Sequence, residues 1–337
     1  MKIKMIAAKC CISIGARVFS HHENILITRW HYLGILALLL FFTNPGHSQI
    51  IEDVGGIATT VHAKSTFKDM SSQSSSTGYQ FQLNTYDAWL PLPPFKVGKT
   101  SILSNLNYRL MDFDYGGKAI NDRSLPDKIH EIKSVIIIRH PISAKWSILG
   151  IVMPALASDL KKSVSFDDLI LDGIVGVSKK FGAESNLEIG IGVHVLQSFG
   201  ETLITPGISF EYQSSNKKWL AQFYWPRLNV LYHLTADTHL GVAGSIDWNR
   251  FNLKNHVGFT GKEIDYAQFS MIHAGLQVHQ RLVGGIWLQV QVGGGFLNRY
   301  EVFDGDQNKI SKFSISNMLY GKAAFTYRFG RRAIKSR

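Results

Sequence analysis

Histidine is the side chain in this sequence with the widest chemical repertoire, because it binds transition metals and transfers protons near neutral pH. Thirteen histidines occur and four of them precede residue 49, so 13 − 4 = 9 lie in the rest of the chain. His273 and His279 stand six residues apart in one alternating segment, as do Glu188 and His194 in another. Six residues of an extended strand span about 20 Å, so neither pair can hold one ion directly. We predict no metal site.

Serine, histidine and acidic residues also form the catalytic groups of hydrolases. Ser209 with Glu211, or His233 with Asp247, could be posed in that way on neighbouring strands. The motifs HExxH, CxxC and DxDxDG do not occur, and the glycines of QVGGGF (residues 291–296) fall inside a predicted strand, where glycine eases curvature or packing. We therefore predict no catalytic residue and no cofactor, and the sequence leaves open whether the chain is an enzyme.

The elements that would position these residues are strands. In LEIGIGVHV (residues 187–195), apolar side chains alternate with polar residues and glycine, which is the two-residue period of a strand with unlike faces. Several such segments reach ten or more residues, and no amphipathic helix separates them, which is typical of transmembrane β-strands of about 9–11 residues. Twelve strands are predicted, over residues 100–113, 129–140, 144–154, 169–180, 187–195, 204–213, 218–226, 228–236, 240–249, 266–279, 286–296 and 319–329.

The predicted fold class is all-β, a transmembrane antiparallel up-and-down β-barrel of about 12 strands. Residues 78–90 and 55–63 also look extended, and together they would give 14 strands, which is the alternative count because bacterial barrels use even numbers. A soluble β-sandwich also has alternating strands. It is less favoured, because the apolar faces continue over five positions and tryptophans stand near strand ends, as in the aromatic girdles of membrane barrels.

The connections alternate in length. Outer-membrane barrels have short periplasmic turns and longer external loops. With the C-terminus in the periplasm, the four long connections at 114–128, 155–168, 251–265 and 298–314 are expected outside. The links at 197–202 and 225–227 are shorter than this pattern requires.

The N-terminal region has the features of a secretory signal. The apolar run at 33–42 follows Arg29 and precedes Gly46 and Ser48, which suit cleavage before Gln49. We expect a signal peptide over 1–48, a flexible periplasmic lead-in over 49–77, the barrel over 78–330 and a basic tail over 331–337. Both cysteines precede the cut, so the exported chain would have no disulfide. Its net charge of (36 − 5) − (25 − 1) = +7 comes from scattered basic residues, which does not indicate nucleic-acid binding.

Alternation also predicts which residues face inward. In the last strand, Phe325, Tyr327 and Phe329 share one face and are expected to contact lipid, whereas Lys322 and Arg328 share the other. Equivalent positions on other strands predict a polar lumen. The residues expected to line it are Glu188, His194, Asp247, Gln289, Gln291, Lys322 and Arg328.

The closing AFTYRFG resembles the C-terminal signal strand that the barrel-assembly machinery recognises, with GRRAIKSR following its last aromatic residue. Together with LPLPPFKVGKTSILSNLNYRL and TPGISFEYQSSNKKWLAQFYWPRLNVLYHLT, it makes residues 78–330 similar to uncharacterised outer-membrane β-barrel families of Bacteroidota-type Gram-negative bacteria. The resemblance implies location in the outer membrane, with its lipid and the assembly machinery as partners, and it implies no activity.

Three functions remain open. The leading hypothesis is a monomeric, passive or selective channel for small solutes, because the predicted inner rows are polar. The alternatives are a lipid-modifying outer-membrane enzyme, and a structural or surface-binding barrel with a filled lumen.

Overall fold

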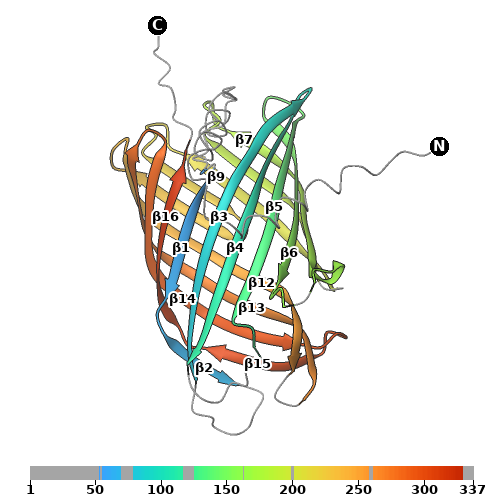
Figure 1. Cartoon of the computed structure of the whole chain (residues 1–337). Coiled ribbons are helices and arrows are strands. Elements are labelled where there is room, and N and C mark those ends of the chain that lie inside the picture. The colour runs from blue at the N-terminus through green and yellow to red at the C-terminus, as the bar shows by residue number, and fades with distance from the viewer. Residues whose placement is uncertain are drawn as a thin grey trace, which may run out of the picture. The chain divides into compact units, whose positions relative to one another are not determined.

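The computed structural model describes residue 53 and residues 55–69, 79–116, 125–161, 163–198, 201–257 and 261–328. These residues form sixteen strands and one 3₁₀ turn, η1 (Figure 1). The elements are β1 Gly55–His62, β2 Ser65–Asp69, β3 Tyr79–Val97, β4 Thr100–Gly116, β5 Lys128–Pro141, β6 Trp146–Ser158, η1 Phe166–Asp168, β7 Leu169–Phe181, β8 Leu187–Ser198, β9 Glu201–Gln213, β10 Trp219–Tyr224, β11 Arg227–His233, β12 Thr238–Val257, β13 Glu263–Val283, β14 Ile286–Phe303, β15 Lys309–Ile315 and β16 Met318–Tyr327. No helix in these described ranges is long and apolar enough to span a membrane.

The wall is a closed antiparallel barrel of 14 strands. From β3 to β14 each strand pairs with the next, and β1 closes the ring by pairing with both β16 and β3. The short strands β2 and β15 continue β1 and β16, because Gly55↔Tyr327 and Phe67↔Ile315 lie in one unbroken register. Each of these two composite strands therefore counts once in the wall.

The alternative count of 14 strands, made from the twelve predicted strands plus the segments 78–90 and 55–63, is confirmed. The expected lead-in over 49–77 is wrong where it left residues 55–69 outside the wall. Residues 55–62 form backbone pairs with β16 on one side and β3 on the other. The barrel therefore begins at Gly55 rather than at residue 78.

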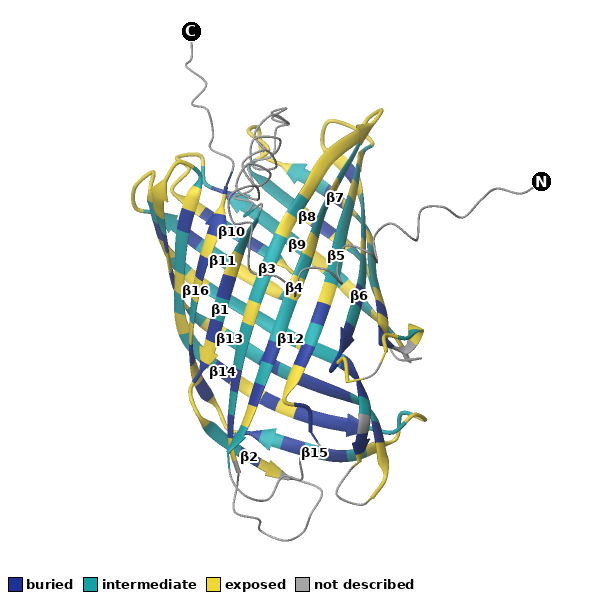
Figure 2. Cartoon of the chain, viewed as in Figure 1, coloured by how far each residue is buried: buried dark blue, intermediate teal, exposed yellow. Residues whose placement is uncertain are grey.

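Side chains alternate between two unlike faces along every wall strand. In β16 the outward Leu319 and Phe325 are exposed, whereas the inward Tyr320, Ala324 and Thr326 are buried. Buried positions are densest towards the lower end of the view, over β12–β15 (Figure 2). Large exposed apolar side chains on the outer face occur on strands around the whole ring, for example Ile57, Leu90, Val175, Ile191, Ile204 and Leu276.

The two ends of the barrel differ. At the terminal end, where Gly55 meets Tyr327, the connections are short: they comprise residues 98–99, 142–145, 182–186, 214–218, 234–237 and 284–285. At the opposite end, called the loop end here, the connections at 117–127 and 159–168 are long, as expected. The expected long loops at 251–265 and 298–314 are mostly strand, because β12 runs to Val257 and β14 to Phe303. The connections that remain between these strands comprise residues 258–262 and 304–308.

The strands also differ in how far they reach towards the loop end. The extended strands β12–β15 continue past the ends of the shorter strands β7–β11. There, Ser158 of β6 pairs in parallel with Asn252 of β12, although five strands separate them in the wall. The barrel therefore narrows at the loop end to the strands that flank this β6–β12 contact.

Candidate functional site: the barrel interior

The loop end of the interior is filled by an apolar core. Phe67 and Phe313 stack at 4.5 Å between ring centroids, and Phe113 packs edge-on against Phe269 and Tyr300. Each large side chain removed fully from water contributes about 1.5–3 kcal/mol, so this core anchors the narrow end. Its members are Phe67, Phe81, Leu83, Met111, Phe113, Leu125, Ile129, Ala155, Ala157, Ile170, Phe251, Leu253, Ile264, Ala267, Phe269, Met271, Tyr300, Val302, Phe313, Ile315 and Met318.

A polar latch holds the β6–β12 contact next to this core. His256 Nε2 lies 2.8 Å from Asp159 Oδ2, and Asn252 Nδ2 donates to Asp168 Oδ1 at 2.8 Å. Lys254 Nζ lies 3.3 Å from the same Asp168 oxygen. The side chains of Asp168 and His256 are buried. Asp168 bonds to Asn252 of β12, and His256 of β12 bonds to Asp159 just after β6, so this group closes a seam.

The two carboxylates of the latch should make the stability of the barrel depend on pH. Burial raises the pKa of Asp159, but hydrogen bonds from His256 and from the backbone of Lys161 and Lys254 outweigh it and hold that pKa below its usual range. Burial likewise raises the pKa of Asp168, but the hydrogen bonds that it accepts outweigh burial, so this pKa is also below its usual range. The donors are Ser165, Ser158, Lys254 and Asn252. A carboxyl whose pKa is lower in the folded protein than in the unfolded chain stabilises the folded state. This stabilisation is fully present above the unfolded pKa of about 3.9 and is lost as the pH falls through the folded pKa.

We therefore expect the wild-type barrel to unfold at a lower temperature at pH 3 than at pH 7. The double variant Asp159→Asn, Asp168→Asn should be less stable at pH 7 and change less between the two values. Loss of the folded band on unboiled gels during heating measures both proteins. An equal drop in wild type and double variant would show that other carboxyls cause the acid sensitivity.

The middle of the interior carries charged side chains from many strands. Arg109 Nε lies 2.6 Å from Asp87 Oδ1, and Lys133 Nζ lies 2.8 Å from Glu131 Oε1. Nearer the terminal end of the same strand β5, Arg139 Nη2 donates to Glu188 Oε1 of β8 at 2.6 Å. These paired charges give the interior a polar, hydrogen-bonded middle layer.

Near the terminal end, Arg328 organises a second polar group, which we call the seam cluster. Its guanidinium Nε donates to Asp53 Oδ1, its Nη2 lies 2.9 Å from His279 Nδ1, and it stacks 4.5 Å over the Trp287 ring. Thr326 Oγ1 donates to the same Asp53 carboxylate at 2.9 Å. The seam cluster therefore ties the start of the described chain to its last strand.

The two wall strands between β9 and β12 are short, because β10 has six residues and β11 has seven. Their hairpin ends at residues 225–226, and the last pairs are Ser209↔Tyr224 and Arg227↔Ser245. Beyond these pairs β9 extends to Glu201 and β12 to Val257. Among the described residues, no wall strand pairs with the facing edges of 201–207 and 247–251. We call this interruption the wall break.

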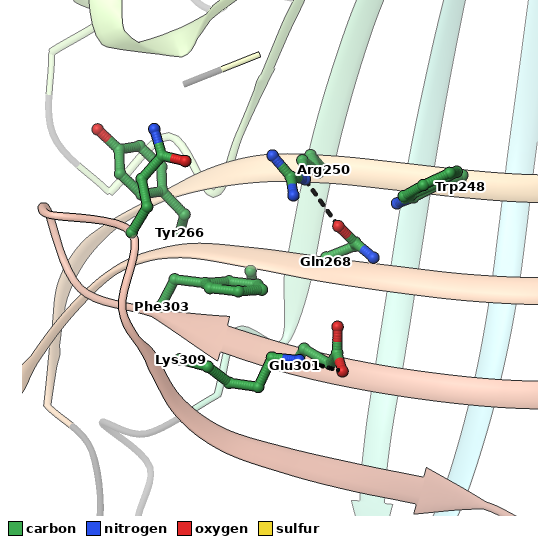
Figure 3. A pocket seen from close by; sticks show the side chains of 9 residues that line it. Trp248, Arg250, Tyr266, Gln268, Glu301, Phe303 and Lys309 are labelled. Carbon is green, nitrogen blue, oxygen red and sulfur yellow. Dashed lines mark hydrogen bonds and ion pairs between the residues drawn. The ribbon is translucent and has the colours of Figure 1, made fainter. Parts of the chain in front are cut away.

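A pocket of about 310 Å³ lies on the outer face of β12–β15 at the loop end. Figure 3 shows its charged lining, with Arg250 Nε donating to Gln268 at 2.7 Å and Lys309 Nζ donating to Glu301 at 2.8 Å. Trp248, which also lines it, is half exposed. The outer face of β12 thus changes from apolar to charged between Trp248 and Arg250.

The structure brings some of the predicted lumen residues together and leaves others apart. Gln289 bonds to Asp53 and Thr326 in the seam cluster, and Gln291 bonds to the Tyr320 hydroxyl. Lys322 is near enough to Asp87 and Asp247 to interact electrostatically with both. His194 lies half-buried on β8, and Glu188 pairs with Arg139 rather than with it.

The other predicted positions are simpler to place. Phe325 and Tyr327 are exposed on the outer face, and Phe329 lies outside the described residues. The two candidate hydrolase pairs are not assembled, because Glu211 accepts from Tyr224 and Asp247 bonds to His273. His233 instead stacks on His239 at 4.0 Å.

Sequence reasoning missed His62 and Asp53, because both lie in the segment assigned to the lead-in. His62 Nε2 is 2.9 Å from His273 Nε2. The signal was present in GGIATTVHA, where Ile57, Thr59 and Val61 alternate with Ala58, Thr60 and His62. That alternation placed His62 on an inner face once the segment was accepted as a strand.

Residues 45–328 match the family model of a domain of unknown function (DUF6268). The chain belongs to this family. Comparison with the curated proteins found no match.

Solved structures with a similar fold include the toluene transporter TodX of Pseudomonas putida, at 12% identity, covering 82% of this chain and 89% of that one with a TM-score of 0.34. The translocator domain of the autotransporter NalP from Neisseria meningitidis has 11% identity, 90% and 95% coverage and a TM-score of 0.32. LpxR from Salmonella typhimurium has 6% identity, 81% and 100% coverage and a TM-score of 0.28.

Proposed function

We propose that this DUF6268 protein is an integral outer-membrane barrel that passes small amphipathic solutes between its terminal end and the wall break. The observation that carries the proposal is the combination of a sealed loop end with an interrupted wall. The proposed path therefore bends sideways instead of running straight through the barrel.

The outer face supports placement in a bilayer. Exposed apolar side chains on a contiguous surface of this size are rare on soluble monomers, and here they encircle the ring. Trp146 and Trp219 are exposed near the terminal end, and Trp248 stands next to the charged pocket towards the loop end. Tryptophans at both limits of an apolar band are typical of membrane interfaces. The bilayer is thus proposed to end near Trp248.

The interior supports a bent path. Polar residues line the middle layer, whereas the loop end is occupied by side chains such as Phe81 and Phe269 that are at most 1% exposed. The wall break lies just beside this core and has an apolar outer rim formed by Ile204, Ile208 and Trp225. A polar interior joined to an apolar rim suits solutes with a polar group and a short hydrocarbon part.

Single-cysteine labelling tests this path, because neither Cys10 nor Cys11 lies in the barrel and residues 49–337 contain no other cysteine. Thr205→Cys places a label on the inner parity of β9 at the break, and Thr85→Cys places one on the inner parity of β3, where the wall is continuous. We expect wild-type protein in vesicles to accelerate uptake of a short-chain fluorescent carboxylate. A bulky maleimide should abolish most of this uptake at position 205 and leave most of it at position 85.

Equal loss of uptake at the two positions would contradict the bent path and favour a straight one. No uptake by the wild-type protein, with a tight electrical seal in planar bilayers, would instead favour a structural or surface-binding barrel with a filled lumen. The ion pairs of the middle layer and the apolar core are the observations behind that second candidate.

A further inference from the structure

Two histidines from distant parts of the chain face each other inside the barrel. His62 on β1 and His273 on β13 approach with their Nε2 atoms 2.9 Å apart. In the wall, β16 and β14 lie between these two strands. His62 is 1% exposed, and the His273 side chain is 13% exposed. Their approach is therefore a feature of the folded interior.

The opposite ring nitrogens are already committed. His62 Nδ1 lies 2.8 Å from the backbone oxygen of Leu83, and His273 Nδ1 lies 2.8 Å from Asp247 Oδ2. A carbonyl and an ionised carboxylate only accept hydrogen bonds, so both Nδ1 atoms must carry the proton. Each neutral ring then presents an unprotonated Nε2, and the two lone pairs point at one another. This arrangement needs a positive centre between the rings.

We propose that His62 and His273 bind one divalent transition-metal ion through their Nε2 atoms. Ligating histidines almost always donate their other ring N–H to a carboxylate or a backbone carbonyl, and this pair shows one of each. With metal–nitrogen bonds of about 2.0–2.1 Å, a nitrogen separation of 2.9 Å gives an angle of about 90° at the metal. Imidazole ligands suit Zn²⁺, Cu²⁺ and Ni²⁺ and not Mg²⁺ or Ca²⁺.

The remaining coordination positions fall to water or to a solute. The described residues contain no group of three or more histidine, cysteine, aspartate or glutamate side chains placed to hold a metal. Asp247 orients His273 and does not reach the metal position, because its contact is to Nδ1. A two-histidine site with open positions can therefore accept an exogenous ligand from the polar interior.

A third aromatic ring lies beside the two histidines. Tyr320 packs against both, at 5.8 Å from the His62 centroid and 4.8 Å from the His273 centroid. A Cβ atom at Gly275 would lie 2.8 Å from the Tyr320 hydroxyl. The lack of a side chain there lets Tyr320 reach its place beside the histidines. This explains part of the glycine content of the facing strands.

Metal titration of the tag-free, detergent-folded protein tests the site, since a polyhistidine tag would bind the same ions. We expect calorimetry to give one Ni²⁺ or Cu²⁺ ion per chain, with at least about tenfold weaker binding in His62→Gln and His273→Gln. Asp247→Asn should weaken binding by about 10–100-fold through loss of orientation. His194→Gln, on the half-buried β8 position, should bind as wild type does.

A second measurement does not depend on the variants folding. The electron paramagnetic resonance spectrum of Cu²⁺ bound to the wild-type protein should show coupling to two imidazole nitrogens. Failure of the wild type to bind either Ni²⁺ or Cu²⁺ would overturn the proposal in favour of a single proton shared by the two rings. Equal binding by wild type and His273→Gln would overturn it in favour of surface histidines. Neither result depends on solute passage.

Discussion

Replacing Phe325 by arginine is expected to lower the amount of folded barrel. Phe325 is 50% exposed on the outer face of β16, the strand that closes the ring against β1 and β14. An arginine on the lipid face costs about 2–4 kcal/mol at the bilayer midplane and less towards the interfaces. Phe325 lies two pairs from the terminal pair Gly55↔Tyr327, so the cost there is below the midplane value, but folded domains are stable by only about 5–15 kcal/mol. The measurement is the fraction of heat-modifiable folded protein recovered from membranes.

Two controls separate lipid exposure from the change in size. Phe325→Leu keeps the outward position apolar and should fold nearly as wild type does. Ile204→Arg and Thr205→Arg place the same charge on adjacent residues of β9, where Ile204 is 65% exposed and Thr205 has the inner parity. Ile204→Arg should assemble poorly and Thr205→Arg well. If both β9 variants assemble equally, the assignment of faces is wrong.

Thr326, the inner neighbour of Phe325, is unsuitable as the inward control. It is 2% exposed, and its hydroxyl donates to Asp53 in the seam cluster. An arginine there would be forced next to Arg328. The sequence alternation distinguishes inner from outer positions, but it does not distinguish an open inner position from a packed one.

The alternation explains why so much of the wall was predictable. A strand with a lipid-like outer face and a polar inner face has period two, so each of the twelve segments from 100–113 to 319–329 carried its own signal. The first strand was harder, because GGIATTVH has small residues on both faces and only two large apolar side chains, Ile57 and Val61. Its place depends on pairing with β3 and with β16, and β16 is far from it along the chain.

The parts that were missed depend on contacts between strands. The inner face of β12 changes from polar at Asp247 and Asn249 to apolar at Phe251 and Leu253, and the outer face becomes charged at Arg250. Outside a bilayer a strand can bury its inner face in a core and show a polar outer face, which reverses the expected pattern. The sequence pattern therefore predicts loops at 251–265 and 298–314, where the structure has mostly strand.

The candidate site shows the same limit. Glu188 and His194 share a face by spacing, yet Glu188 pairs with Arg139, 49 residues away. His62 and His273 are 211 residues apart and meet only because the ring closes between β1 and β16. Spacing within one strand predicts which side chains share a face. It does not predict which strands lie opposite.

The second large effect is expected from Asp53→Ala. This variant should destabilise the seam between β1 and β16, where the ring closes. The variant removes the carboxylate that pairs with Arg328 and accepts from Thr326 and Gln289. The Arg328 side chain is 8% exposed and its Nη1 has no hydrogen-bond partner, so the charge would remain buried and poorly solvated. Removing one partner of a buried pair costs about 3–5 kcal/mol, and the 28% exposure of Asp53 places this case towards the lower value.

The reverse deletion should be milder, and this asymmetry is the sharpest test of the seam. Arg328→Met leaves Asp53 with two hydrogen-bond donors and partial contact with water, and methionine can still pack on Trp287. The double variant Asp53→Leu, Arg328→Met removes both charges and should recover most of the stability lost in Asp53→Ala, because apolar replacement of a buried pair is often neutral. Hydrogen exchange of β1 and β16 amides in the folded protein reports the seam directly. Wild-type exchange rates in Asp53→Ala would mean that backbone pairing alone holds the ring closed.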